Sequence, residues 1–235
     1  MYFDQRHYDV RCEWGLQAIT QLGALADVLI IIDTLSFTTC VDIAVGRGAI
    51  VYPYRWRDAP LNDFAASIEA VVAGASRGGA GFTLSPASLL GIEPGTKLVL
   101  PSPNGSALSL AVDGRITFAG CIRNAKAVAR AAEAVGSRIL VVPAGERWPD
   151  HTLRPGVEDM LGAGAIIHYL GGTKSPEAAA AEAVYLAADG DIEAVLQECS
   201  SGRKLIERGF SKDVEIAAQL NVSKIAPKLI EGAYR

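Results

Sequence analysis

The sequence predicts an α/β protein with three layers, a mainly parallel sheet between helices, and a helical C-terminal segment. Short runs rich in Val, Ile and Leu are typical of buried strands, because a strand of a parallel sheet is covered on both faces. Most of these runs are followed by a helical pattern, and this alternation is typical of parallel strands joined by crossover helices. The expected strands lie at residues 27–33, 49–53, 97–101, 115–119 and 138–143.

Helical patterns fill the intervals between these strands. The segment 157–170 is apolar on nearly every face, so we expect it to be buried against the sheet or, in a homodimer, against a partner subunit. From residue 176 the pattern contains helices and no convincing strand, so residues 176–235 are expected to form the helical end of one domain, residues 1–235. The expected helices are 38–46, 60–74, 105–112, 123–135, 157–170, 176–188, 191–199, 201–208 and 212–220.

Composition excludes several classes of protein. The 235 residues include 22 Lys and Arg against 26 Asp and Glu, which leaves a net charge of −4. An acidic chain without a basic run lacks the electrostatic footprint of nucleic-acid-binding proteins. The N-terminus is polar, and no apolar run approaches the ~18 residues of a membrane span. We therefore expect a cytoplasmic protein that binds neither nucleic acid nor a membrane.

Polar residues follow the expected strands at four points along the chain. In open parallel sheets, ligands bind beyond the carboxyl ends of the strands, where helix N-termini present unpaired N–H groups. The candidate site residues are Asp33, Thr38, Thr39, Asn104, Gly105, Ser106, Arg123, Asn124, Gly145, Arg147, Arg154, Glu158 and Asp159.

These groups suit a site for magnesium and phosphate. Oxygen ligands bind a hard cation, and N–H and guanidinium groups donate to phosphoryl oxygens. Asp33 is the strongest candidate, because a carboxylate directly after an apolar strand is poorly solvated unless it meets a cation or several donors. The alternative is structural. Ser, Thr and Asn at helix starts are ordinary N-caps, and acids in a first turn favour the helix dipole.

The leading hypothesis is hydrolysis of a phosphate monoester. Mg²⁺ would be held by Asp33 with Glu158 or Asp159, one carboxylate would orient or deprotonate the attacking water, and an arginine such as Arg123 would stabilise the equatorial oxygens. The groups expected to bind the phosphoryl group are Thr38, Thr39, Asn104, Gly105 and Ser106. A phosphoaspartyl route would need a second aspartate two residues after Asp33, where the chain has Leu35. A non-catalytic binder of a phosphorylated ligand is the alternative from another class.

The order and spacing of several segments point to one family. These segments are Asp33–Thr39, Pro103–Ser106, Arg123–Ala125, Ala144–Gly145, Glu158–Ala165 and Arg208–Val214. In them the chain resembles the 2-phosphosulfolactate phosphatase family. The resemblance implies a three-layer α/β fold and a magnesium-dependent phosphatase that converts the small phosphorylated acid (R)-2-phospho-3-sulfolactate to sulfolactate and phosphate in coenzyme M biosynthesis.

The chain departs from the family pattern at two places. Phe37 stands where family members tend to have arginine, and Gly78–Gly81 stands where they have a charged segment. We therefore expect Arg123, Arg147 and Arg154 to bind the anionic groups of the substrate, unless the substrate is another small phosphate ester.

Overall fold

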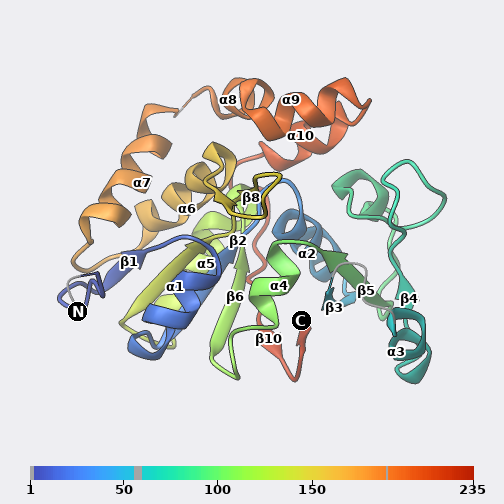
Figure 1. Cartoon of the computed structure of the whole chain (residues 1–235), viewed down its shortest axis with the longest axis horizontal. Helices are drawn as coiled ribbons and strands as arrows, with labels where there is room; N and C mark the ends of the chain where they lie inside the picture. Colours follow the sequence, from blue (N-terminus) through green and yellow to red (C-terminus); the bar gives the residue numbers. More distant parts are fainter. Residues whose placement is uncertain (1–2, 56–59, 189) are drawn as a thin grey trace.

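The first sheet is parallel and forms the centre of the molecule. The computed structural model describes residues 3–55, 60–188 and 190–235, in which strands alternate with helices (Figure 1). The sheet has the order β1-β7-β2-β6. Its strands are β1 (Val10–Cys12), β2 (Val28–Ile32), β6 (Ile116–Gly120) and β7 (Ile139–Pro143). The predicted α/β class with a parallel sheet is confirmed, and β1 was missed because three residues are too few to show a pattern.

Side chains of β2 alternate between the two faces of this sheet, and each face packs on its own helices. Ile30 and Ile32 share a core with α5 (Ala125–Glu133) and α6 (Val157–Tyr169). Leu29 and Ile31 share a core on the opposite face with the helices α1 (Gly15–Leu22) and α4 (Gly105–Ser109). The three expected layers are therefore present. α1 was not predicted, since its eight residues offer little more than two turns of periodicity.

Helix α6 is buried within the chain, as its apolar sequence predicts. It packs on α5 and most extensively on α7 (Pro176–Ala187). The two helices approach closely at Gly164, where an added Cβ would lie 2.0 Å from the backbone oxygen of Ala181. Only glycine fits this approach without moving a helix.

Gly164→Ala is therefore expected to destabilise the fold by about 2 kcal/mol, because the clash with a backbone oxygen outweighs the better helix propensity of alanine. Gly91→Ala is the matched control, since an added Cβ there would meet no atom within 4 Å. Thermal and urea unfolding of both variants measure the difference. Equal stability of Gly164→Ala and wild type would contradict this packing.

A second sheet lies beside the first and has the order β10-β11-β3-β5-β4. Its parallel strands are β3 (Ile50–Arg55), β5 (Lys97–Ser102) and β4 (Val71–Val72). Helix α2 (Phe37–Gly46) connects β2 to β3 and shares an apolar core with β3 and β5. The helix predicted over 60–74 is wrong at its C-terminal end. α3 spans Leu61–Ser67, and the left-handed backbone of Glu69, with φ of 54°, precedes β4.

The C-terminal segment contains the expected helices and an unexpected hairpin. The helices after α7 are α8 (Ile192–Glu198), α9 (Ser200–Glu207) and α10 (Ser211–Ala217), which lie along the top of Figure 1. The expectation of no strand after residue 176 is wrong, because β10 (Leu229–Ile230) and β11 (Ala233–Tyr234) form an antiparallel pair. Two-residue strands are formed by pairing with distant chain and leave no local pattern.

This hairpin joins the two sheets. Tyr234 of β11 pairs with Val51 of β3, and the N–H of Ala119 in β6 donates to the carbonyl of Pro227 at 2.9 Å. Across the residues that the structure describes, no helix is both long and apolar enough to cross a membrane.

Candidate active site

Asp33 lies at the carboxyl end of β2, where the loops after several parallel strands meet. β2 pairs in register with β6 and β7, so Ile32 lies beside Gly120 and Pro143 and the three strands end at one level. The Asp33 carboxylate accepts hydrogen bonds from the N–H groups of Gly105 at 2.8 Å and Phe37 at 3.3 Å. The predicted meeting of Asp33 with the Asn104–Ser106 turn is therefore present.

The Asp33 carboxyl group is 7% exposed, and its burial raises its pKa to about 6. The N–H groups of Gly105 and Phe37 act in the opposite direction, and the nearby Glu146 carboxylate adds to the rise. A carboxyl group whose pKa lies near neutrality is suited to proton transfer or to a bound cation that offsets its burial.

A cavity of about 360 Å³ opens over Asp33. Two carboxylates, Asp33 and Glu146, line it together with hydroxyl and amide groups. Three cationic side chains line the same cavity, one from the glycine-rich loop of residues 74–81 and two from the C-terminal helical segment. These are Arg77, Lys204 and Arg208. An anion that enters this cavity meets both cationic groups and carboxylates able to bind a metal.

Asp159 connects the loops that follow β2 and β7. Its Oδ1 accepts from the N–H of Thr34 and its Oδ2 from the N–H of Gly145, both at 2.8 Å. Burial raises the pKa of Asp159 well above its usual range, and the charges of Asp33 and Glu158 raise it further. Asp159 and Gly145, two of the predicted site residues, therefore interact with each other and hold the loops after β2 and β7.

Glu158 points elsewhere, as expected for the preceding position on a helix. Its Oε1 accepts a hydrogen bond from Ser201 on α9, and its Oε2 is buried with no partner among the described residues. Glu158 does not line the cavity over Asp33 in the part of the chain that the structure describes.

Most of the hydroxyl and amide groups predicted to bind phosphate instead form hydrogen bonds with backbone groups. The Thr38 hydroxyl accepts from the N–H of Asp33 and donates to its carbonyl, and the Thr39 hydroxyl donates to the carbonyl of Thr34. The Ser106 hydroxyl donates to the carbonyl of Leu100, and the Asn124 side chain caps its own turn through the N–H of Cys121. All four side chains are fully buried, but only Asn124 makes a capping hydrogen bond, because helices α2 and α4 have no side-chain cap. Asn104 differs, because it lines the cavity.

The three arginines expected to bind the substrate lie outside the cavity lining. Arg123 pairs with the buried Asp42 at 3.0 Å and lines a different pocket. Arg154, in the short strand β9 (Leu153–Arg154), stacks over the Trp148 ring at 5.6 Å. Arg147, in β8 (Glu146–Arg147), donates to the carbonyl of His151. Arg147 lines a neighbouring pocket, whereas the partners of Arg123 and Arg154 hold those two side chains elsewhere.

Sequence reasoning did not select Arg77, Lys204 or Arg208. Arg77 lies in the glycine-rich segment, where no secondary structure was expected to position it. Arg208 is the first residue of a segment that resembles the family, so this motif could have identified Arg208 as a candidate site residue.

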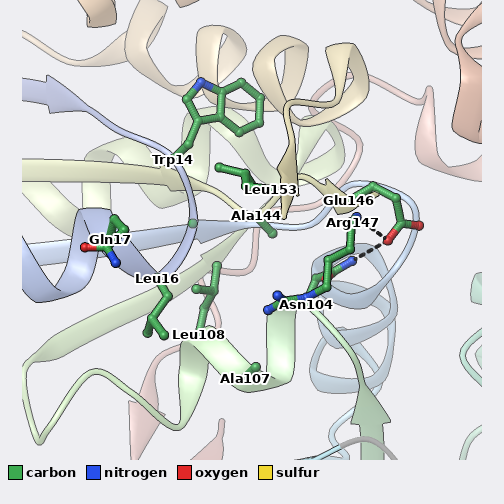
Figure 2. A pocket seen from close by; sticks show the side chains of 11 residues that line it. Trp14, Leu16, Gln17, Asn104, Ala107, Leu108, Ala144, Glu146, Arg147 and Leu153 are labelled. Carbon is green, nitrogen blue, oxygen red and sulfur yellow. Dashed lines mark hydrogen bonds between the residues drawn. The ribbon is translucent and has the colours of Figure 1, made fainter. Parts of the chain in front are cut away.

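A second pocket adjoins the first and has a volume of about 300 Å³. Figure 2 shows its apolar lining, which includes Trp14, Leu108 and Leu153. Asn104 and Glu146 line both pockets, and the Asn104 amide donates to Glu146 Oε1 at 3.2 Å. The N–H of Arg147 donates to the same oxygen at 3.0 Å. Glu146 is thus held in place at the boundary between the two pockets.

The donor set fits magnesium in one of its common modes. Across the described residues, no group of three or more His, Cys, Asp or Glu side chains is arranged to hold a metal ion, so Asp33, Glu158 and Asp159 do not form a ready cage. Mg²⁺ often binds through one or two carboxylates, with waters and substrate phosphate completing its octahedron. Asp33 and Glu146, which line one cavity, offer those carboxylates.

Comparison with known proteins shows the family to which the chain belongs. The family model described as 2-phosphosulpholactate phosphatase matches residues 16–232. The chain is 33% identical over 210 residues to a probable 2-phosphosulfolactate phosphatase of Carboxydothermus hydrogenoformans, which covers 85% of each chain. It is 32% identical over 219 residues to a protein of Deinococcus radiodurans with the same description, covering 88% of this chain and 89% of the relative. The chain therefore belongs to the 2-phosphosulfolactate phosphatase family.

Proposed function

We propose that this protein is a magnesium-dependent phosphatase that hydrolyses 2-phosphosulfolactate to sulfolactate and phosphate. The observation that carries the proposal is the cavity over Asp33, which two carboxylates and three cationic side chains line together. The carboxylates suit a hard cation, and the cations suit a substrate with both a phosphate and a second acidic group. Family membership supports the reaction class.

The residues that line the cavity would have different roles in hydrolysis. In the reaction, a water oxygen bonds to phosphorus, the bond from phosphorus to the substrate oxygen breaks, and the proton released by water ends on the alcohol product. Asp33 and Glu146 would hold Mg²⁺, which when bound neutralises charge on the phosphoryl oxygens. Arg77, Lys204 and Arg208 place positive charge where the transferring group is most negative, and Asn104 can donate to one of its oxygens.

The proposal predicts a substrate preference as well as a metal requirement. We expect phosphate release from 2-phosphosulfolactate with Mg²⁺, at a kcat/KM at least about tenfold above that for a simple alkyl phosphate, because each charge-assisted hydrogen bond contributes ~1.5–3 kcal/mol. Phospholactate should lie closer to 2-phosphosulfolactate, since it keeps the second acidic group. EDTA should abolish turnover, and added Mg²⁺ should restore it.

The other outcomes separate the alternatives. Equal turnover of the alkyl phosphate would show that no second-anion contact contributes, and the substrate would then be another phosphate ester. Tight binding of these esters without phosphate release would identify a non-catalytic binder.

A further inference from the structure

Arg77 is held at the wall of the cavity by two partners. Its Nη1 donates to Asp213 Oδ2 at 2.7 Å, and both Nη atoms donate to Ser36 Oγ at 3.2 Å. Ser36 belongs to the loop that begins with Asp33, and it lines the same cavity. The guanidinium group of Arg77 is therefore fastened to the loop that begins with Asp33.

These bonds leave one edge of the guanidinium group free. Because Ser36 Oγ bonds both Nη atoms, it occupies the edge between them, and Asp213 takes the outer N–H of Nη1. The edge formed by Nε and Nη2 has no acceptor among the described residues, although Arg77 lines the cavity. Such an edge matches two oxygens of a phosphate, a sulfonate or a carboxylate.

Asp213 is the residue that holds Arg77 in this position. Its side chain is 1% exposed, and its Oδ1 accepts from the Ser85 hydroxyl at 2.6 Å and from the N–H of Ala87 at 3.0 Å. A buried carboxylate is costly unless it is paired and hydrogen-bonded, and here all of these donors come from the segment that follows β4. Asp213 thereby joins helix α10 to the loop that carries Arg77.

Phe210, at the start of α10, brings a second cation to the same place. The guanidinium carbons of Arg77 and Arg208 each lie 5.9 Å from the centre of its ring, a distance typical of a cation–π contact. Lys204 lies one turn before Arg208 on α9, with its Nζ 3.8 Å from Glu146 Oε2. The C-terminal helices thus supply or orient every cationic group found in the described cavity lining.

We propose that Arg77 binds an anionic group of the phosphate-ester substrate through its Nε–Nη2 edge, and that Asp213 and Phe210 are positioning residues for it. The inference rests on the proposed function for the identity of the cavity as the active site. It assigns the C-terminal helices a direct part in substrate binding.

The test is a double-mutant cycle on Arg77 and Asp213. Arg77→Ala should raise the KM for 2-phosphosulfolactate about tenfold or more, which corresponds to the loss of one charge-assisted hydrogen bond. Asp213→Asn should raise KM by a smaller factor with little change in kcat, and the double variant should be no worse than Arg77→Ala alone, because Asp213 acts through Arg77. Added guanidinium ion should partly restore Arg77→Ala.

The matched control is Glu215→Gln, which makes a similar change in an accessible ion pair on the same helix, 2.9 Å from Lys212. It should leave KM unchanged. If Asp213→Asn does not fold, Ser85→Ala removes one hydrogen bond to Asp213 without removing its charge. That variant should then raise KM, again without a further effect in the Arg77→Ala background.

Binding of inorganic phosphate, measured by calorimetry with Mg²⁺ present, separates this inference from the proposed reaction. Weaker phosphate binding in Arg77→Ala would support the inference even if the wild type did not turn over 2-phosphosulfolactate. Unchanged phosphate affinity and KM in Arg77→Ala would overturn it even if the wild type were active. Additive losses in the double variant would overturn the positioning role of Asp213, and a wild type that neither binds phosphate nor turns over the ester would overturn both proposals.

Discussion

Asp33→Asn is expected to reduce phosphate release by a factor on the order of 10²–10³, while the protein remains folded. The change removes the negative charge from the centre of the cavity but keeps the shape of the side chain, so binding of a hard cation is lost first. Initial rates at several Mg²⁺ concentrations measure the effect. Asp113→Asn is the control, because this exposed residue has a φ of 51°, a conformation that asparagine tolerates. Turnover of Asp33→Asn within threefold of wild type would remove Asp33 from the site.

The same variant should show a characteristic pH dependence of stability without metal. Burial raises the pKa of Asp33 from 3.8 to about 6, so the folded protein binds more protons than the unfolded chain between about pH 4 and 6. The contribution of Asp33 to stability is therefore present below pH 4 and is lost as the pH rises through 6. Since asparagine does not titrate, the Tm of Asp33→Asn relative to wild type should rise from pH 4 to pH 7. A constant difference in Tm would show that the Asp33 pKa is not raised by folding.

Asp159→Asn is expected to lower both stability and activity, whereas Glu158→Gln should change stability by less than about 1 kcal/mol. Both Asp159 oxygens accept backbone N–H groups, so the amide places a donor against the N–H of Thr34 or Gly145. Loss of a hydrogen bond to a charged or buried group lowers the free energy of unfolding by about 1.5–3 kcal/mol. The loops after β2 and β7 would then no longer be connected through Asp159. Glu158 already has one buried oxygen without a partner in the described structure, so removal of its charge also removes an uncompensated cost.

Urea unfolding and steady-state kinetics of the two variants separate these roles. Similar small effects at both positions would favour the helix-dipole explanation for the two acids. A larger loss for Glu158→Gln than for Asp159→Asn would reverse the assignment of the structural tie.

Two kinds of candidate residue had the same appearance in the sequence. Asp33 and Thr38 both follow an apolar strand, yet Asp33 lines the cavity and the Thr38 hydroxyl only closes the backbone of the loop. Asn104 and Ser106 lie in one turn, and the same division separates them. Short polar side chains at helix starts can serve either purpose, since both depend on the same unpaired N–H and carbonyl groups.

The cationic side chains that line the cavity could not be predicted from the sequence. Arg77 is positioned by Asp213, which lies 136 residues further along the chain. Arg123 resembles a substrate-binding arginine in the sequence, but its guanidinium group is used by Asp42 and by the carbonyl of Ile216. A long side chain reaches several places, so its direction depends on which partners the fold brings near.

Four features of this protein could be predicted from its sequence alone: the parallel sheet, the buried helix α6, the position of Asp33 at a strand end, and the family. Each of these follows from local patterns, because a strand covered on both faces must be apolar along its whole length and a ligand site must interrupt that pattern. Three other features became visible only in the folded protein: the division into two sheets, the hairpin formed by β10 and β11, and the lining of one cavity by Arg77, Lys204 and Arg208 together with Asp33. These features depend on contacts between residues far apart in the chain, and such contacts leave no periodic signal in the residues that make them.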